Sequence, residues 1–158
     1  MLTVAQFSVG CLNDAHPPAL ILPRTEREEP ILVGRAGQKR AAVFLSGSYK
    51  FRSFQYDTSD RWSGLIFKGI TIEMDESTVF DPDFRGAPLG SLVRQDTRLC
   101  ICAMEEGKFG LDHAKISLID GIDALPERHS AGFLKWQIVL GEGVEKRVLW
   151  AVDVTPRT

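Results

Sequence analysis

The chain has 158 residues, of which 44% are hydrophobic and 25% are charged, with a formal net charge of −2. A chain of this size and composition can bury a core without a metal or a disulfide, so we predict one globular domain over residues 1–158. The slightly negative charge excludes a generic polyanion-binding surface and confines any nucleic-acid contact to a local patch.

Short strand-like segments, separated by glycine and proline, run through the whole chain. The sequence contains 14 Gly and 8 Pro, and no long stretch keeps the apolar period of a helix. Such a pattern favours an all-β fold, either an antiparallel β-sandwich or a partly open β-barrel with short helical turns at 59–62 or 121–125. The predicted strands are 2–9, 19–23, 31–35, 39–45, 49–56, 64–75, 92–94, 97–105, 114–119, 133–140 and 147–154.

A basic stretch rich in aromatic residues spans residues 30–56 and contains no carboxylate. Cations that neutralise phosphates, combined with aromatic rings that stack on bases, are typical of nucleic-acid-binding surfaces. The stretch therefore gives one functional hypothesis, a nucleic-acid or anion site. Its candidate residues are Arg35, Lys39, Arg40, Lys50 and Arg52.

Alternation along the predicted strand 49–56 favours a plainer interpretation of this stretch. Lys50 and Arg52 fall on one face of the strand, whereas Tyr49 and Phe51 fall on the other. A stacking platform needs rings and cations on the same face. We therefore expect a half-buried strand, with Tyr49 and Phe51 in the core and the two cations in water.

The charge reverses immediately downstream, because residues 69–84 contain five carboxylates and no Lys or Arg. If the acidic strand pairs with strand 49–56, then Glu73 and Asp75 lie opposite Lys50 and Arg52 and set the register of the two strands. The acidic loop at 81–83 lacks the glycine-spaced pattern of a calcium-binding loop, so no metal site is predicted there.

The last third of the chain carries the clearest strand pattern. Apolar residues alternate along 133–140 and again along 147–154, with a glycine-containing loop between, which predicts an antiparallel hairpin. Trp136 and Trp150 are expected near each other across it. Phe133, Val139 and Leu149 are apolar on the wetter face, so we expect that face to be covered by another sheet or by a partner.

Residues able to do chemistry are few and scattered. Cys100 and Cys102 share one face of a predicted strand, a poor ligand set for zinc, so buried structural thiols are expected and no metal or cofactor is predicted. A small β-fold enzyme acting on a small molecule would draw on loop histidines and their neighbouring carboxylates. Its weak catalytic candidates are Asp112, His113, Glu127 and His129, with Cys100 as a more distant option.

The absence of a recognisable catalytic pattern favours a non-catalytic interaction or regulatory protein, one that binds a partner protein or a second copy of itself through a sheet face or loops. Nucleic-acid binding and small-molecule catalysis remain the alternatives. The odd cysteine count and the lack of a positively charged leader indicate a soluble, cytosolic protein with reduced thiols and no membrane segment.

Overall fold

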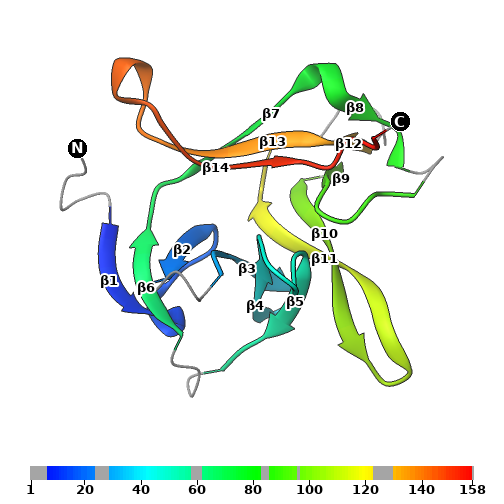
Figure 1. Ribbon diagram of the computed structural model, residues 1–158, viewed down its shortest axis with the longest axis horizontal. Coiled ribbons are helices and arrows are strands. Elements are labelled where there is room, and N and C mark those ends of the chain that lie inside the picture. Colours follow the sequence, from blue (N-terminus) through cyan, green and yellow to red (C-terminus); the bar gives the residue numbers. More distant parts are fainter. Residues whose placement is uncertain are drawn as a thin grey trace.

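The computed structural model describes residues 7–23, 29–57, 62–82, 86–95, 97–122 and 130–157, and within them strands predominate (Figure 1). The all-β prediction is confirmed. The larger sheet contains β1 (Phe7–Cys11), β2 (Ala19–Pro23), β3 (Ile31–Ala36), β4 (Lys39–Phe44), β5 (Arg52–Gln55), β6 (Ser63–Phe67), β8 (Val79–Phe80), β9 (Leu92–Gln95), β10 (Arg98–Gly107), β11 (Gly110–Asp120) and β12 (Ala131–Phe133). The smaller sheet contains β7 (Thr71–Met74), β13 (Lys135–Leu140) and β14 (Arg147–Asp153).

Five strands of the larger sheet close into a barrel in the order β3, β4, β5, β10 and β11. The barrel closes where Ser117 of β11 pairs with Arg35 of β3. The neighbours are antiparallel except for β5 and β10, which are parallel at the pairs Met104↔Arg52 and Glu105↔Ser53. β2, β6 and β1 extend the sheet from β3, whereas β9, β12 and β8 extend it from β10. Turns between strands include the 3-10 helices η1 (Leu12–Asp14), η2 (Glu76–Thr78) and η3 (Gly143–Glu145).

Two clusters of buried apolar side chains lie on opposite faces of β2, β3 and β4. The main core joins the barrel interior to the smaller sheet, and it includes Leu32, Ile101 and Ile138, all with 0% exposure. The second core lies on the other face of the same strands, with Ile31 and Val33 among its members. Because successive side chains of a strand point to opposite faces, the unbroken apolar run of β3 supplies both cores.

The two sheets meet at Phe51, Gly90 and Trp136. The amide of Phe51 donates to Phe44 of β4, and its carbonyl accepts from Met104 of β10. Its ring packs against Gly90, where an added Cβ would lie 2.3 Å from the ring. The carbonyl of Gly90 in turn accepts a hydrogen bond from the Trp136 indole at 2.8 Å. This junction therefore ties the barrel to the smaller sheet.

Two predicted strands differ from the structure in an informative way. Segment 64–75 is two strands in different sheets, β6 and β7, separated by Gly69 at φ 66°. Predicted strand 2–9 is described only from Phe7, where β1 begins. The possible helical turns at 59–62 and 121–125 fall mostly outside the described residues. No helix in the described parts of the chain is long and apolar enough to span a membrane.

The predicted C-terminal hairpin is confirmed as β13 and β14. A bulge between Ile138 and Val139 shifts the register, so Trp150 lies opposite Ile138 and Val152 lies opposite Trp136. Val139, predicted to be covered, is 1% exposed and is therefore buried within the chain itself. It gives no reason to invoke a partner.

Candidate functional site

The expected alternation fails at the start of the strand predicted at 49–56. Phe51 has φ 62°, and backbone hydrogen bonds from Lys50 to Gly47 and from Arg52 to Tyr49 close turns there, so the strand begins only at Arg52. Phe51 is buried as predicted, but Tyr49 is 52% exposed. The prediction that Tyr49 lies in the core is therefore wrong, because two turns intervene before the strand.

The outer faces of β4 and β5 carry aromatic side chains. On β4, Ala41 and Val43 point into the main core, so Ala42 and Phe44 point outward to the second core. Phe54 lies opposite Ala42 and therefore shares this outer face. Phe44, Phe54 and Trp62 are partly buried against the second core. We call the five residues Phe44, Tyr49, Phe54, Tyr56 and Trp62 the aromatic face.

The rings of the aromatic face contact one another in a continuous row. Phe44 is its centre, with ring centroids 5.2 Å from Phe54, 5.7 Å from Trp62 and 6.1 Å from Tyr49. Phe54 continues the row to Tyr56 at 6.4 Å. Such spacings are those of interacting aromatic pairs. The row therefore holds several rings in fixed positions, and its Tyr49 end is open to solvent.

Arginines flank the aromatic face at both ends. The Arg52 guanidinium carbon lies 5.1 Å from the centroid of the exposed Tyr49 ring. At the other end, the amide of Tyr56 bonds the carbonyl of Arg40, and Arg35 lies directly opposite Arg40 across β3 and β4. Burial raises the pKa of the Tyr56 phenol, while the charges of Arg40 and Arg35 oppose that rise. Both guanidiniums are therefore close enough to act on this ring.

Three of the five predicted cations, Arg35, Arg40 and Arg52, lie beside the aromatic face. Lys39 shares its strand face with Ala41, on the side away from the aromatic face. Lys50 lies over the Phe51 ring at 4.9 Å, near the junction of the two sheets. The Arg40 guanidinium donates to the carbonyl of Asn13 at 2.8 Å. No described carboxylate forms an ion pair with any of the five, although Glu29 lies beside Gly47 in the β4–β5 connection.

The predicted pairing of Lys50 and Arg52 with Glu73 and Asp75 is wrong. β5 lies between β4 and β10, whereas β7, which carries Glu73, pairs with β13 of the smaller sheet. The physical reason is the turn at Gly69, which sends β7 away from the barrel. The acidic and basic strands are neighbours in sequence but lie in different sheets.

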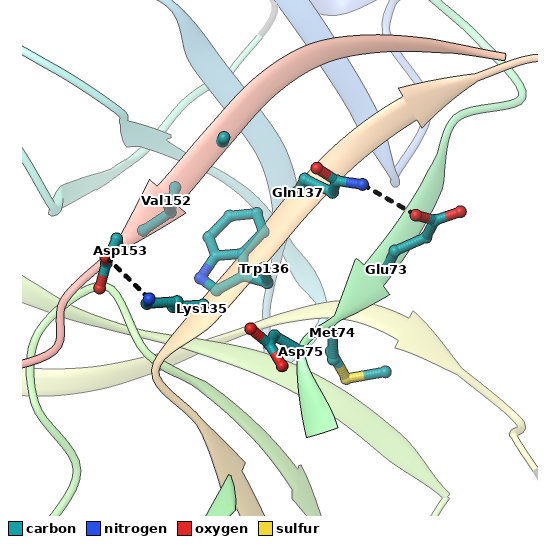
Figure 2. A pocket seen from close by; sticks show the side chains of 9 residues that line it. Glu73, Met74, Asp75, Lys135, Trp136, Gln137, Val152 and Asp153 are labelled. Carbon is teal, nitrogen blue, oxygen red and sulfur yellow. Dashed lines mark hydrogen bonds and ion pairs between the residues drawn. The ribbon is translucent and has the colours of Figure 1, made fainter. Parts of the chain in front are cut away.

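Glu73 and Asp75 of the acidic strand, with Asp153 of β14, line a hollow of about 410 Å³ on the smaller sheet (Figure 2). Glu73 accepts from Lys146 at 2.6 Å and from Gln137 at 2.9 Å. Asp75 caps η2 by accepting a hydrogen bond from the amide of Ser77. Asp153 lies 3.5 Å from the ammonium of Lys135. Because Glu73, Asp75 and Asp153 already have partners within the chain, we interpret these contacts as stabilising the smaller sheet rather than forming a ligand site.

These contacts predict that the protein loses stability in acid. Hydrogen bonds from Lys146 and Gln137 lower the pKa of Glu73 below its ordinary 4.5, and bonds from Ser77 lower that of Asp75 below 3.8. A carboxyl whose folded pKa lies below its unfolded pKa stabilises the fold fully above the unfolded pKa, and this contribution is lost as the pH falls from there through the folded pKa. We expect the urea concentration at the midpoint of unfolding to decrease as the pH drops below about 5, and to decrease less with pH in Glu73→Gln. An unchanged dependence in Glu73→Gln, with Glu142→Gln as the exposed control, would contradict this assignment.

A second hollow, of about 790 Å³, is lined by His113, Lys115 and Cys102 together with residues before β9. His113 and Asp112 are neighbours on β11, both are exposed, and they point to opposite faces of the strand. Cys102 is buried, and burial raises the pKa of its thiol, as it does for Cys100. Raised pKa values favour the neutral thiol, which is a weak nucleophile. Neither cysteine therefore supports the hypothesis of a cysteine-based enzyme.

The remaining catalytic candidates, Glu127 and His129, lie outside the described residues. Within the described ranges, no group of three or more His, Cys, Asp or Glu side chains is arranged to hold a metal ion. Sequence reasoning missed Trp62, because nothing in its local pattern links it to Phe44. It also separated Tyr49 from Arg52, which the turns bring together.

Comparison with known proteins gives a family but no activity. A family model described as "Uncharacterised protein y4lG" matches residues 9–158. A protein of Sinorhizobium fredii with the same description is 45% identical over 150 residues, which cover 95% of this chain and 92% of that relative. No solved structure matches the chain.

Proposed function

We propose that this chain, which belongs to the family described as uncharacterised protein y4lG, binds single-stranded nucleic acid on its aromatic face. One observation carries the proposal: a continuous row of aromatic rings ends in arginines on the same outer face of β4 and β5. Rings offer stacking surfaces to unpaired bases, and guanidiniums offer charge and hydrogen bonds to phosphates.

The positions of Arg35 and Arg40 support the binding of an anion. Arg35 and Arg40 lie directly opposite each other, and like charges in that position destabilise a sheet. An anion bound between them would relieve this repulsion. Tyr49 is 52% exposed even though the Arg52 guanidinium lies against its ring, so a base can reach it.

The size of the face suits a short strand. Arg40 and Phe44 are four positions apart on β4, and Arg52 precedes Ser53, which pairs with Val43, so at the rise of an extended chain Arg40 and Arg52 lie roughly 13 Å apart along the strands. Bases of a duplex are already stacked and are not available to these rings, which is why we propose a single strand. The net charge of −2 confines the attraction to this patch.

Fluorescence anisotropy with a labelled single-stranded oligonucleotide tests the proposal. With three arginines in contact with phosphates, the slope of log K against log salt should be about −2 for a single strand. Arg35→Gln and Arg52→Gln should each make the slope shallower by about 0.7. Tyr49→Ala should weaken binding by about 1–3 kcal/mol at every salt concentration, because stacking is not screened.

Arg147→Gln is the matched control, because Arg147 is an exposed arginine on the smaller sheet. It should leave both the affinity and the slope unchanged. No binding at low salt, equal loss in Arg147→Gln and Arg52→Gln, or a salt-independent affinity would overturn the proposal. The alternative of an interaction protein is taken up below on a different observation, and a cytosolic location remains a prediction.

A further inference from the structure

The hairpin formed by β10 and β11 ends in a fully exposed aromatic side chain. Its strands pair as far as Gly107↔Gly110, which leaves Lys108 and Phe109 as a two-residue turn. Phe109 is 94% exposed and Leu111 is 43% exposed. In Figure 1 the hairpin extends well beyond the rest of the barrel. We call residues 105–112 the finger.

Folding of the turn does not account for Phe109. Neither Lys108 nor Phe109 has a positive φ, so the turn accepts most side chains and does not require an aromatic ring. A large apolar ring at this position gains nothing from the chain's own core. Together with Leu111 on the same hairpin, it leaves apolar surface available for contact with another molecule.

The finger is acidic around its exposed ring. Glu105 and Asp112 lie directly opposite each other, and Glu106 follows on β10, against a single cation at Lys108. No ion pair is described for these three carboxylates. The finger thus repeats, with negative charge, the repulsive pairing that Arg35 and Arg40 show on β3 and β4.

We propose that the finger of one copy docks on the aromatic face of a second copy, with Phe109 against the rings and the carboxylates beside the arginines. The two surfaces match in chemistry, because an acidic apolar tip meets a basic aromatic face. The finger does not dock on the aromatic face of its own chain, since Phe109 is 94% exposed in the single chain.

The position of the finger favours reciprocal docking. β10 runs beside β5, where Met104 pairs with Arg52, so the base of the finger adjoins the face that accepts the other finger. Adjacent donor and acceptor surfaces allow a two-fold arrangement in which each copy gives and receives one finger, and such a dimer is closed. The partner is therefore a second copy of this chain.

The inference deepens the proposed function and, for its regulatory part, rests on it. The finger offers carboxylates and a ring, the two kinds of group that a nucleic-acid strand offers as phosphates and bases. Finger and strand then compete for one face, so the dimer is the form that does not bind. Self-association itself does not depend on nucleic acid.

Sedimentation velocity on the full chain, with and without oligonucleotide, tests the inference. The wild-type chain should be dimeric at about 100 μM and low salt, and rising salt should weaken the dimer. Phe109→Ser should be monomeric. Val144→Ser is the matched control, because Val144 is equally exposed at the tip of the other hairpin, between β13 and β14, and its loss should leave the dimer intact.

A charge exchange tests which surfaces meet. Glu106→Lys and Arg52→Glu should each be monomeric alone, whereas an equimolar mixture of the two should dimerise, because both docked pairs again carry opposite charges. A monomeric wild-type chain, an intact dimer in Phe109→Ser, or no rescue in the mixture would overturn the inference.

The experiments distinguish a failure of the proposed function from a failure of the proposed self-association. Oligonucleotide should convert the wild-type dimer into monomeric complexes, and Phe109→Ser should bind the strand more tightly than the wild type. A Phe109-dependent dimer that binds no oligonucleotide would overturn the proposed function and leave self-association standing. Oligonucleotide binding by a chain that is always monomeric would overturn self-association and leave the proposed function standing.

Discussion

Replacement of Gly90 by Ala is expected to lower the free energy of unfolding by about 2–4 kcal/mol. Gly90 has φ 84°, a conformation that costs a side chain about 1–2 kcal/mol. The added Cβ would also lie 2.3 Å from the Phe51 ring. The carbonyl of Gly90 holds the Trp136 indole, so a shift of this residue disturbs the contact between the sheets.

Urea denaturation of three variants separates the two causes. Gly69→Ala carries a similar backbone penalty, with φ 66°, but an added Cβ meets nothing within 4 Å, so it should lose only the backbone part. Combining Gly90→Ala with Phe51→Leu should give a loss smaller than the sum of the single variants, since the smaller leucine makes room for the added methyl group and the methyl group fills part of the space that the ring leaves. Equal losses in Gly90→Ala and Gly69→Ala would show that the ring contact is unimportant.

A Gly34→Ala variant is expected to open the barrel where it closes. An added Cβ would lie 2.5 Å from the carbonyl oxygen of Ser117, the residue that pairs with Arg35 across the closing strands. A backbone oxygen cannot rotate away as a side chain can, so β3 and β11 must separate. We expect a loss of about 2–4 kcal/mol, within the range of strongly overpacked sites.

Hydrogen exchange locates this effect. The amides of β3 and β11 should lose protection, while those of β13 and β14 keep theirs. Ile116→Ala, which removes the Cγ2 atom 2.8 Å from the same Cβ, should not reduce the additional loss caused by Gly34→Ala, because the main obstacle is backbone. If Gly34→Ala cost nothing further in the Ile116→Ala background, or if protection fell uniformly in both sheets, the barrel closure would not be the point of strain.

Much of the strand content was predictable because strand signals are local. β2 coincides with its predicted segment, and the alternating run at the C-terminus formed the predicted hairpin. Both patterns depend on which face of a strand is buried, which the order of apolar and polar residues records. The break at Gly69 was less predictable, since one glycine in an apolar run is compatible with a continuous strand.

The candidate site was only half predictable. The sequence places cations and rings close together between residues 35 and 56, but alternation alone put Tyr49 in the core and separated it from Arg52. The left-handed backbone of Phe51 instead leaves Tyr49 exposed beside Arg52. Phenylalanine rarely adopts this conformation, so the sequence does not predict the turn. Trp62 joins the aromatic face from a distant part of the chain.

By itself, the sequence determined that this protein is built from short strands with an apolar interior and that residues 30–56 carry five cations and no carboxylate. Tertiary structure decided which strands are neighbours, and so moved Glu73 to Lys146 and left Arg35, Arg40 and Arg52 on one outer face. The physical reason is that burial acts on each strand separately, whereas pairing depends on turns and on close backbone approaches such as that at Gly34.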